Sequence, residues 1–287
     1  MSRIAYVNGR YLRHAEAGVH IEDRGYQFSD GVYEVCGVRH GQLMDEDYHL
    51  ERLERSLREL RIAMPMNMRA LRLVLREVVR MNGIADGMVY LQVTRGVARR
   101  DHPFPNPAVR PALVITAKRL SLVKIAQAVA QGVAVVTMSD QRWARRDIKS
   151  ISLLANILAK QAAREAGAYE AWLVDQDGFV TEGSSTNAWI VDADGRVITR
   201  PLSADILPGV TRRVLLEAAA REGIEVVERP FTVGEARSAR EAFISACTAI
   251  ITPVVKVDGQ VIGNGAPGSI TMRLRAAYDS ATQTGRA

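Results

Sequence analysis

Arg145-Arg146-Asp147-Ile148-Lys149-Ser150 lies between a strand-like run and a helix-like run, and the lysine at position 149 is its reactive group. Two motifs follow it along the chain: Glu182-Gly183-Ser184-Ser185-Thr186-Asn187 and Leu207-Pro208-Gly209-Val210-Thr211. The chain thus offers, in order, an amine, a carboxylate beside a polar loop, and a Gly-Val-Thr turn that opens a helix. Because the first turn of a helix has free backbone N–H groups, this turn is a candidate phosphate site.

Together the three groups match the needs of one cofactor, pyridoxal phosphate. A lysine such as Lys149 forms a Schiff base with its aldehyde, a carboxylate such as Glu182 pairs with its pyridinium nitrogen, and a helix start takes its phosphate. Each group alone has a simpler explanation: a surface lysine, an acid in a turn, and a Pro-Gly turn followed by threonine. Their combination in this order predicts an enzyme.

Length and composition are those of a globular enzyme with two domains. From 287 residues we expect a small N-terminal domain over 1–118, a linker over 119–132 and a larger C-terminal domain over 133–287. No apolar run reaches the roughly 18 residues of a membrane helix, and the N-terminus has no hydrophobic signal core. We therefore expect a cytoplasmic protein that does not bind a membrane. The cysteines and histidines lack metal-ligand spacing, so we expect no metal.

The formal net charge of +6 raises the question of nucleic acid. The basic residues occur as isolated pairs or alternate with acids, and no basic tract with spaced aromatic residues is present, so we expect no nucleic acid partner. An anion-binding or nucleic-acid-binding protein on a degenerate enzyme scaffold is the alternative from another class, and it would purify colourless. The chain has no GxxxxGK[ST] or GxSxG motif and no GxGxxG after a strand, so NTPase, α/β-hydrolase and dinucleotide-dependent functions are not indicated.

The hydrophobic pattern predicts an α+β fold. Leucines at helical spacing over 50–60 and a second periodic run over about 67–82 predict two helices among the N-terminal strands. In the C-terminal part, Ser150 is predicted to cap a helix that runs to about residue 165. A further helix is predicted over about 210–221, after the Gly-Val-Thr turn.

Several motifs carry a resemblance to a known family. The resemblance covers residues 4 to about 275, and its motifs are Glu22–Val35, His49–Leu53, Gln92–Gly96, Asp147–Ser150, Leu158–Gln161, Tyr169–Ala171, Val180–Ser185 and Ile251–Val254. On these motifs the chain resembles the fold-type IV pyridoxal-phosphate aminotransferases, and within them the D-amino acid aminotransferases. The resemblance implies two α/β domains with the cofactor site between them, and a homodimer.

The resemblance also implies roles for the cofactor-binding residues. Lys149 would be the Schiff-base lysine and proton shuttle, Glu182 would pair with the pyridinium, and Leu207 would pack on the ring. The phosphate would be bound by Arg52, Val210 and Thr211. One position departs from the family: Cys247 aligns with a phosphate-binding threonine, so either the Cys247 backbone N–H or the neighbouring Thr248 would make that contact.

The substrate-binding residues implied by the resemblance are Tyr33, Arg100 and His102, which match a trap for the substrate α-carboxylate. In similar enzymes the last two lie on a loop that reaches in from the neighbouring subunit. Asp101 stands between them where a small neutral side chain is expected, and it could partly neutralise Arg100. An exposed charged loop is the structural alternative for residues 100–102.

The expected reaction is a ping-pong transamination. A D-amino acid such as D-alanine or D-glutamate would give its amino group to the cofactor, and a 2-oxo acid such as 2-oxoglutarate would accept it, with Lys149 as nucleophile and then as general acid–base. Two other activities of the same fold remain as alternatives. A branched-chain L-amino acid aminotransferase would typically have Glu-Gly-x-Gly-x-Asn where this chain has residues 182–187. The other alternative is aminodeoxychorismate lyase.

Overall fold

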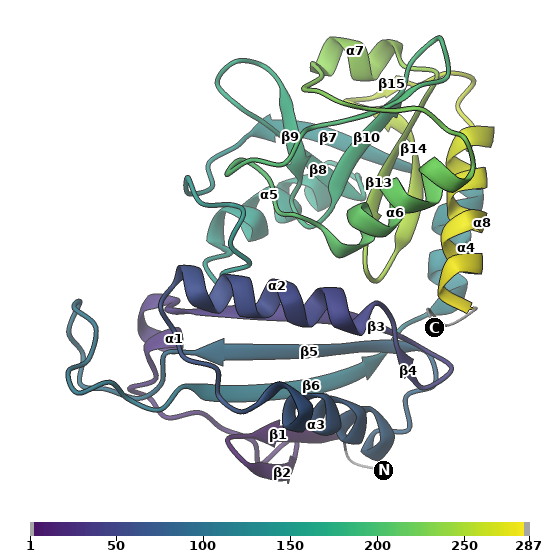
Figure 1. Ribbon diagram of the computed structural model, residues 1–287. Coiled ribbons are helices and arrows are strands. Elements are labelled where there is room, and N and C mark those ends of the chain that lie inside the picture. Colours follow the sequence, from purple (N-terminus) through teal and green to yellow (C-terminus); the bar gives the residue numbers. More distant parts are fainter. Residues whose placement is uncertain (1–2, 284–287) are drawn as a thin grey trace. The chain divides into compact units, whose positions relative to one another are not determined.

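A computed structural model describes residues 3–283, and the chain divides into two compact units (Figure 1). Unit 1 comprises the chain up to Ser121 together with Ile148–Ser152, and unit 2 comprises Leu122–Asp147 and the chain from Leu153 onward. Lys149 therefore belongs to unit 1, although the segments on both sides of it belong to unit 2. Among residues 3–283, no helix is both long and apolar enough to span a membrane.

Unit 1 is an antiparallel sheet with helices packed on one face. Within the described residues the strands follow the order β2-β1-β6-β5-β3-β4. They are β1 Ile4–Val7, β2 Arg10–Arg13, β3 Gly31–Arg39, β4 Gln42–Leu43, β5 Gly87–Thr94 and β6 Ala112–Arg119. The helices are α1 Arg24–Phe28, α2 Glu46–Glu59 and α3 Met68–Met81.

The core of unit 1 follows from the period of two along its strands. Val89, Leu91 and Val93 of β5 are buried and share one hydrophobic cluster with Leu53 of α2 and Leu75 of α3. Because successive side chains of a strand point to opposite faces, the residues between them lie on the other face. Tyr90 is one of these, and its ring centroid lies 5.7 Å from that of Tyr33 on β3. One face of the sheet is therefore core, and the other carries tyrosines.

Unit 2 contains a mixed sheet with helices around it. Its strand order in the described residues is β12-β11-β10-β13-β14-β7-β8-β9, with β15 paired to β14. The strands are β7 Val133–Ser139, β8 Glu170–Val174, β9 Val180–Gly183, β10 Asn187–Val191, β11 Val197–Thr199, β12 Val226–Glu228, β13 Glu241–Ala246, β14 Ile250–Val257 and β15 Gln260–Val261. The helices are α4 Leu122–Gln131, α5 Leu154–Glu165, α6 Val210–Arg221, α7 Val233–Ser238 and α8 Ser269–Gln283.

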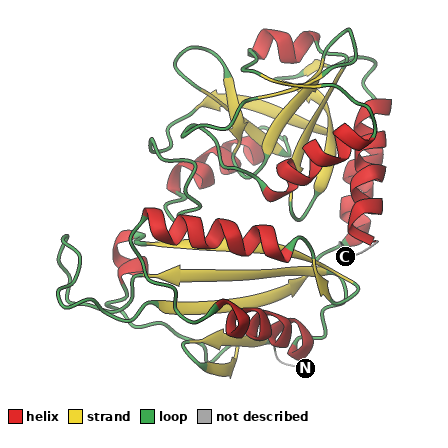
Figure 2. Ribbon diagram, viewed as in Figure 1, coloured by secondary structure: helices red, strands yellow, loops and turns green. Residues whose placement is uncertain are grey.

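The α+β class predicted from the sequence is confirmed, and Figure 2 shows both helices and strands in each unit. Helices α3 and α6 lie where their patterns predicted them. The predicted cap at Ser150 is wrong, because α5 begins at Leu154 and Ser150 instead forms a bridge with Val32 of β3. The short helices α1 and α7 were not predicted, and α4 lies within the segment expected to be a linker.

Candidate active site

Lys149 is held by backbone pairing at the edge of strand β3. The Tyr33 N–H donates to the Lys149 carbonyl at 3.0 Å, and the Ile151 N–H donates to the Gly31 carbonyl at 3.1 Å. The Lys149 N–H in turn donates to the Ser56 hydroxyl of α2 at 3.4 Å. Residues 149–151 thus extend the sheet of unit 1 by a short pairing. The position of the lysine backbone is therefore fixed by a strand far away in sequence.

The Lys149 side chain lies on the tyrosine face of this sheet. Its Nζ atom is 4.3 Å from the centre of the Tyr33 ring, within the range of a cation–π interaction. The structure therefore brings together two residues that the sequence predicted separately, one as cofactor lysine and one as part of the carboxylate trap.

Arg52, predicted to bind phosphate, is held by a buried carboxylate on the core face of the same sheet. Its Nε and Nη2 donate to the two carboxylate oxygens of Glu34, each at 2.8 Å, and His49 Nδ1 donates to the same carboxylate at 2.8 Å. Burial acts to raise the pKa of Glu34, but the charge and hydrogen bonds of Arg52 and His49 lower it to about 2. The orientation of the Arg52 guanidinium is thus fixed before any ligand binds.

Arg100 and His102 lie on the exposed loop between β5 and β6, which extends beyond the ends of the strands (Figures 1 and 2). The Asp101 carboxylate accepts from the His102 N–H at 2.8 Å. Among the described residues it forms no ion pair with Arg100, and its effect on carboxylate binding stays a prediction. Nor does a hydrogen bond, ion pair or ring contact within residues 3–283 join Arg100 or His102 to Tyr33 or Lys149.

In unit 2, Glu182 lies at the centre of a buried polar cluster. One carboxylate oxygen forms an ion pair with Arg142, and the other accepts from Asn187 Nδ2 at 3.0 Å. The Leu207 N–H donates to both oxygens, at 3.2 and 3.1 Å. The structure therefore joins Glu182 and Leu207, two predicted cofactor residues that are 25 positions apart, and adds Arg142 and Asn187 to them.

Arg142 is shared between two carboxylates. It also forms an ion pair with Asp140, with Nη2 and Oδ2 at 2.8 Å. Burial acts to raise the pKa of Asp140, but the hydrogen bonds and charge of Arg142 lower it overall. For Glu182 the balance is opposite: burial raises its pKa, and Arg142 and the Leu207 amide offset this only in part. Burial thus favours the protonated form of Glu182, and a further donated N–H would favour its charged form.

The Gly-Val-Thr turn opens α6 close to this cluster. Gly209 is the N-cap residue and offers no side-chain hydrogen bond to the first helical amides. A Cβ atom on Gly209 would lie 2.1 Å from Asn187 Oδ1, so only glycine fits beside this amide. Val210 and Thr211 are buried in the first turn that follows. These amides and the Thr211 hydroxyl are the groups by which a helix start binds phosphate.

The polar loop after Glu182 is held by a second buried carboxylate, Glu170 of β8. Its oxygens accept from the hydroxyls of Ser184 and Ser185, the latter at 2.9 Å, and from Thr186 at 3.4 Å. Lys160 forms an ion pair with it at 3.3 Å. The serines therefore fix the loop beside Glu182 and are not arranged as nucleophiles.

Cys247 and Thr248 lie in the turn between β13 and β14, and both are partly buried. The turn ends at Ile250, whose φ of 58° is left-handed. Which of the two residues would contact phosphate stays a prediction.

Comparison with known proteins identifies the family. The family model of class IV aminotransferases matches residues 31–257, which is more than half of the chain. The chain belongs to the class IV aminotransferases. The family resemblance and the aminotransferase activity predicted from the sequence are thereby confirmed.

Individual relatives agree with this assignment. The chain is 41% identical over 273 residues to a D-alanine aminotransferase from Bacillus licheniformis, covering 95% of both chains. In structure it is similar to a branched-chain amino acid aminotransferase from Escherichia coli, with a TM-score of 0.91 and 26% identity over 98% of this chain and 95% of the other. A branched-chain amino acid aminotransferase from T.th., solved with pyridoxamine 5'-phosphate, has a TM-score of 0.90 and 27% identity over 100% of this chain and 96% of the other.

Sequence reasoning missed three polar residues of the site. Arg142 and Asp140 follow strand β7 without any recognisable spacing, so no local signal indicates them. Asn187 ends the motif 182–187, but the motif alone does not indicate a role for it. Its amide group donates to Glu182 and to the Leu207 carbonyl, so it joins the carboxylate to the turn that precedes α6.

Proposed function

We propose that this chain transfers the amino group of D-amino acids to a 2-oxo acid such as 2-oxoglutarate, with pyridoxal phosphate as cofactor. The observation that carries the proposal is the 41% identity to a D-alanine aminotransferase over 95% of both chains. The branched-chain aminotransferases are similar in structure, but their identity to this chain is only 26–28%. Ser185, whose hydroxyl donates to Glu170, also stands where the Glu-Gly-x-Gly-x-Asn pattern typical of the branched-chain enzymes has its second glycine.

The residues of the chain fit this cofactor. The structural relative from T.th. contains its amino form, pyridoxamine 5'-phosphate. In this chain, Lys149 offers an amine, Glu182 a buried carboxylate, and α6 an N-terminus without a capping side chain. A Cβ atom on Gly209 would meet Asn187 Oδ1, so this glycine allows Asn187 to lie against both Glu182 and the start of α6.

Lys149 and Glu182 would have different roles toward the cofactor. Bound pyridoxal phosphate supplies an electron sink that stabilises negative charge at the substrate Cα atom. Lys149 Nζ would bind the cofactor covalently. Once the substrate amine has displaced it, the freed Lys149 amine would take the proton from the substrate Cα and return it at the cofactor carbon. Glu182, oriented by Arg142 and Asn187, would accept the N–H of the pyridine ring and keep that nitrogen protonated.

The phosphate and the substrate carboxylate would be held by separate groups. The amides of Val210 and Thr211 and the guanidinium of Arg52 would bind the phosphate, together with the turn at Cys247 and Thr248. Tyr33, Arg100 and His102 would bind the α-carboxylate of the substrate. An arginine is suited to this task because its planar fork matches a carboxylate in geometry and charge.

A homodimer is part of the proposal. Helix α5 exposes three apolar side chains at helical spacing, Leu154, Ile157 and Leu158, with exposed fractions of 71%, 60% and 59%. Such a stripe is typical of a surface that another protein covers. The loop that carries Arg100 and His102 extends from the end of its sheet, as a loop must if it is to reach a neighbouring subunit. We propose the cytoplasm as the location of the reaction, because two cysteines in 287 residues are too few for the disulfide framework of a secreted protein.

The test is a comparison of amino donors. We expect turnover of D-alanine with 2-oxoglutarate, with kcat/KM well above that for L-isoleucine. A preference for L-isoleucine would instead support the branched-chain activity, and pyruvate formed from aminodeoxychorismate would support the lyase.

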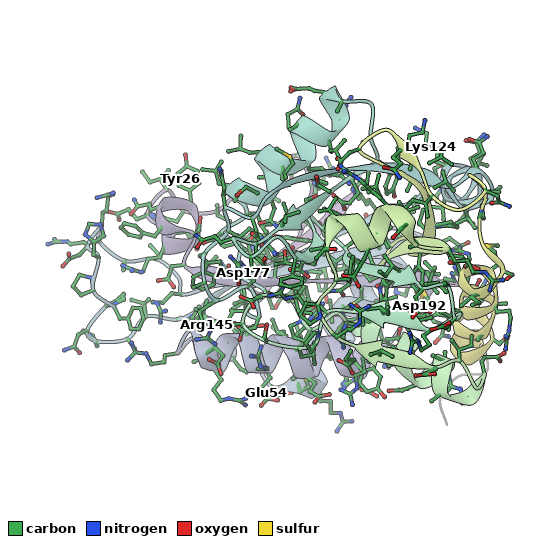
Figure 3. All side chains as sticks on the ribbon, turned by 90° about the horizontal axis from the view of Figure 1, so that it is seen from above. Tyr26, Glu54, Lys124, Arg145, Asp177 and Asp192 are labelled. Carbon is green, nitrogen blue, oxygen red and sulfur yellow. The ribbon has the colours of Figure 1, made fainter. Side chains whose placement is uncertain are left out.

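Replacing the lysine is the most direct mutation. Lys149→Ala should abolish turnover, because no other group of the chain is proposed to bind the cofactor covalently. The matched control is Lys124→Ala on α4, an exposed lysine labelled in Figure 3, which should keep full activity. If Lys149→Ala retained even a tenth of the wild-type rate, the role given to Lys149 would be wrong.

A further inference from the structure

Arg24, a residue of the Glu22–Val35 motif with no role in the proposed chemistry, holds the backbone of the loop that carries Arg100 and His102. Its side chain is buried. Nη1 donates to the Asp101 carbonyl at 2.6 Å and Nη2 donates to the His102 carbonyl at 3.1 Å. Arg24 therefore binds the two successive peptide groups between and beside the proposed carboxylate-binding residues, while their side chains remain exposed.

Asp30 fixes Arg24 from the other side. Its Oδ2 accepts from Arg24 Nε at 2.8 Å and from Arg95 Nε at 2.7 Å, and its Oδ1 accepts from Arg95 Nη2 at 2.9 Å. The guanidinium of Arg95 lies 3.6 Å from the centre of the Phe104 ring, further along the same loop. Burial acts to raise the pKa of Asp30, but the two arginines lower it overall. One carboxylate thus couples two arginines that hold the loop at two places.

Helix α1 supplies an aromatic surface beneath the loop. The Phe28 ring lies 5.6 Å from the His102 ring and 5.0 Å from the Arg100 guanidinium, measured to ring centroids. Tyr26, on the same helix, is 75% exposed and points away into solvent (Figure 3). The side of α1 that carries Arg24 and Phe28 is thus the side that contacts the loop.

Helix α1 is itself firmly attached to the end of β5. The Asp23 side chain accepts from the Gly25 N–H at 2.8 Å and from the Thr94 hydroxyl at 2.9 Å. A Cβ atom on Gly25 would lie 2.2 Å from Thr94 Cγ2, so only glycine allows this approach. Helix α1, which carries Arg24, is therefore fixed to the sheet independently of the loop that Arg24 holds.

Ordering a loop during binding costs conformational entropy, and a loop fixed in advance avoids that cost. A guanidinium can fix two successive carbonyls and pair with a carboxylate at once, because its donors form a rigid planar fork. A lysine ammonium is a point charge on a flexible stem and cannot reproduce this arrangement. These simultaneous contacts with Asp30 and with two carbonyls therefore require arginine at position 24.

We propose that Arg24, held by Asp30, is a positioning residue that fixes Arg100 and His102 for the substrate α-carboxylate. The inference rests on the proposed function, because it concerns the residues proposed to bind that carboxylate. It predicts that Arg24 governs affinity for carboxylates and leaves the proton transfers of Lys149 unaffected.

Arg24→Lys in the full-length holoenzyme tests the proposal through kinetics. We expect KM for D-alanine to rise about tenfold while kcat changes less than about twofold, since the loss of two charge-assisted hydrogen bonds falls on binding. The inhibition constant of propionate, which has the carboxylate but no amine, should rise in parallel. The control is Arg80→Lys on α3, an exposed arginine paired with Glu77, and it should change none of these values. A fall in kcat with unchanged KM would overturn the proposal.

Hydrogen exchange of the peptide covering residues 99–107 gives a readout independent of activity. We expect faster exchange in Arg24→Lys, with unchanged exchange in α2 and β3, and equal exchange in both proteins would overturn the proposal. If the wild type failed to use D-alanine, the proposed function would be wrong. The hydrogen-exchange comparison would still test whether Arg24 holds the loop. Should Arg24→Lys not fold, Phe28→Leu, which keeps the ion pair with Asp30 and removes the ring, is expected to give the same rise in KM and faster loop exchange.

Discussion

Glu34 in unit 1 and Glu182 in unit 2 are both fully buried carboxylates that contact an arginine, yet their pKa values move in opposite directions. Glu34 receives two hydrogen bonds from Arg52 and one from His49, and its pKa falls to about 2. Glu182 shares Arg142 with Asp140, and burial raises its pKa. The difference lies in the charge that each carboxylate receives: Arg52 gives Glu34 two hydrogen bonds, whereas Arg142 divides its donors between Glu182 and Asp140, whose own charge also raises the pKa of Glu182.

This difference separates a structural carboxylate from a reactive one. A carboxylate that receives two hydrogen bonds and the charge of one arginine stays ionised and holds that arginine in place. A carboxylate that shares its arginine gains most when a further N–H arrives, such as that of a protonated pyridine ring. We therefore interpret Glu34 as the support of Arg52, and Glu182 as the group that meets the cofactor nitrogen.

The largest effect is expected from Glu34→Gln. Removing one partner of a buried ion pair leaves Arg52 uncompensated, and we expect the free energy of unfolding to fall by about 3–5 kcal/mol. Because the folded pKa of Glu34 lies below its unfolded value, its contribution is present above about pH 4.5 and is lost as the pH falls toward about 2. Denaturant unfolding between pH 2 and 7 should therefore show this slope in the wild type and not in the variant. Glu77→Gln, at an exposed carboxylate on α3, should behave as wild type.

Glu182→Gln should lower activity without lowering stability, in contrast to the loss of stability expected for Glu34→Gln. We expect kcat to fall roughly 10²–10³-fold, the scale of removing one preorganised electrostatic group. Because burial raises the pKa of Glu182, its charge opposes folding at neutral pH, so the stability of the cofactor-free protein should be unchanged or higher. A stability loss as large as that of Glu34→Gln would contradict the distinction between the two carboxylates.

Arg142→Met sharpens the comparison by removing the shared arginine. We expect kcat to fall about tenfold, consistent with loss of a charge-assisted hydrogen bond. Arg142 opposes the rise in the pKa of Glu182, so its removal should raise that pKa further and move the acid limb of the kcat profile to higher pH. Arg145→Met changes a more exposed arginine of the same segment, labelled in Figure 3, and should leave the profile in place. An acid limb that stays at the wild-type pH in Arg142→Met would argue against this role.

The smallest effect is expected from Gly209→Ala. The added Cβ atom would lie 2.1 Å from Asn187 Oδ1, so Asn187 must move away from Glu182 and the start of α6. We expect the dissociation constant of pyridoxal phosphate, measured by absorption titration, to rise about fivefold, at the lower end of overpacking costs. Gly234→Ala on α7 has an ordinary contact of 3.7 Å and serves as the control. Unchanged cofactor affinity in Gly209→Ala would separate this turn from the phosphate site.

Much of the fold and part of the site could be predicted from the sequence, since they depend on local patterns. Helices α3 and α6 follow from apolar spacing and from a glycine turn, and Lys149 and Glu182 follow from motifs read in order. The error at Ser150 has a clear physical reason. Residues 149–151 pair with β3, more than a hundred positions away, and this pairing overrides the local preference of a serine for a helix cap.

The parts that could not be predicted share one property. Arg142, Asn187 and Arg24 act through contacts made by folding, namely with Glu182, with the Leu207 carbonyl and with the carbonyls of Asp101 and His102. A single sequence does not reveal which arginine will meet which carboxylate. Arg24 and Asn187 lie within motifs that identified the family, so the resemblance indicated where they are but not what they do.

The most direct test of the account is the visible absorption of the purified, cofactor-loaded protein, recorded before and after addition of D-alanine and, separately, of L-isoleucine. The account predicts that D-alanine removes the absorption of the Lys149-bound cofactor, that 2-oxoglutarate restores it, and that L-isoleucine leaves it unchanged. Loss of the absorption with L-isoleucine alone would contradict the D-amino acid specificity. A protein that stays colourless with added pyridoxal phosphate would contradict the enzyme assignment itself.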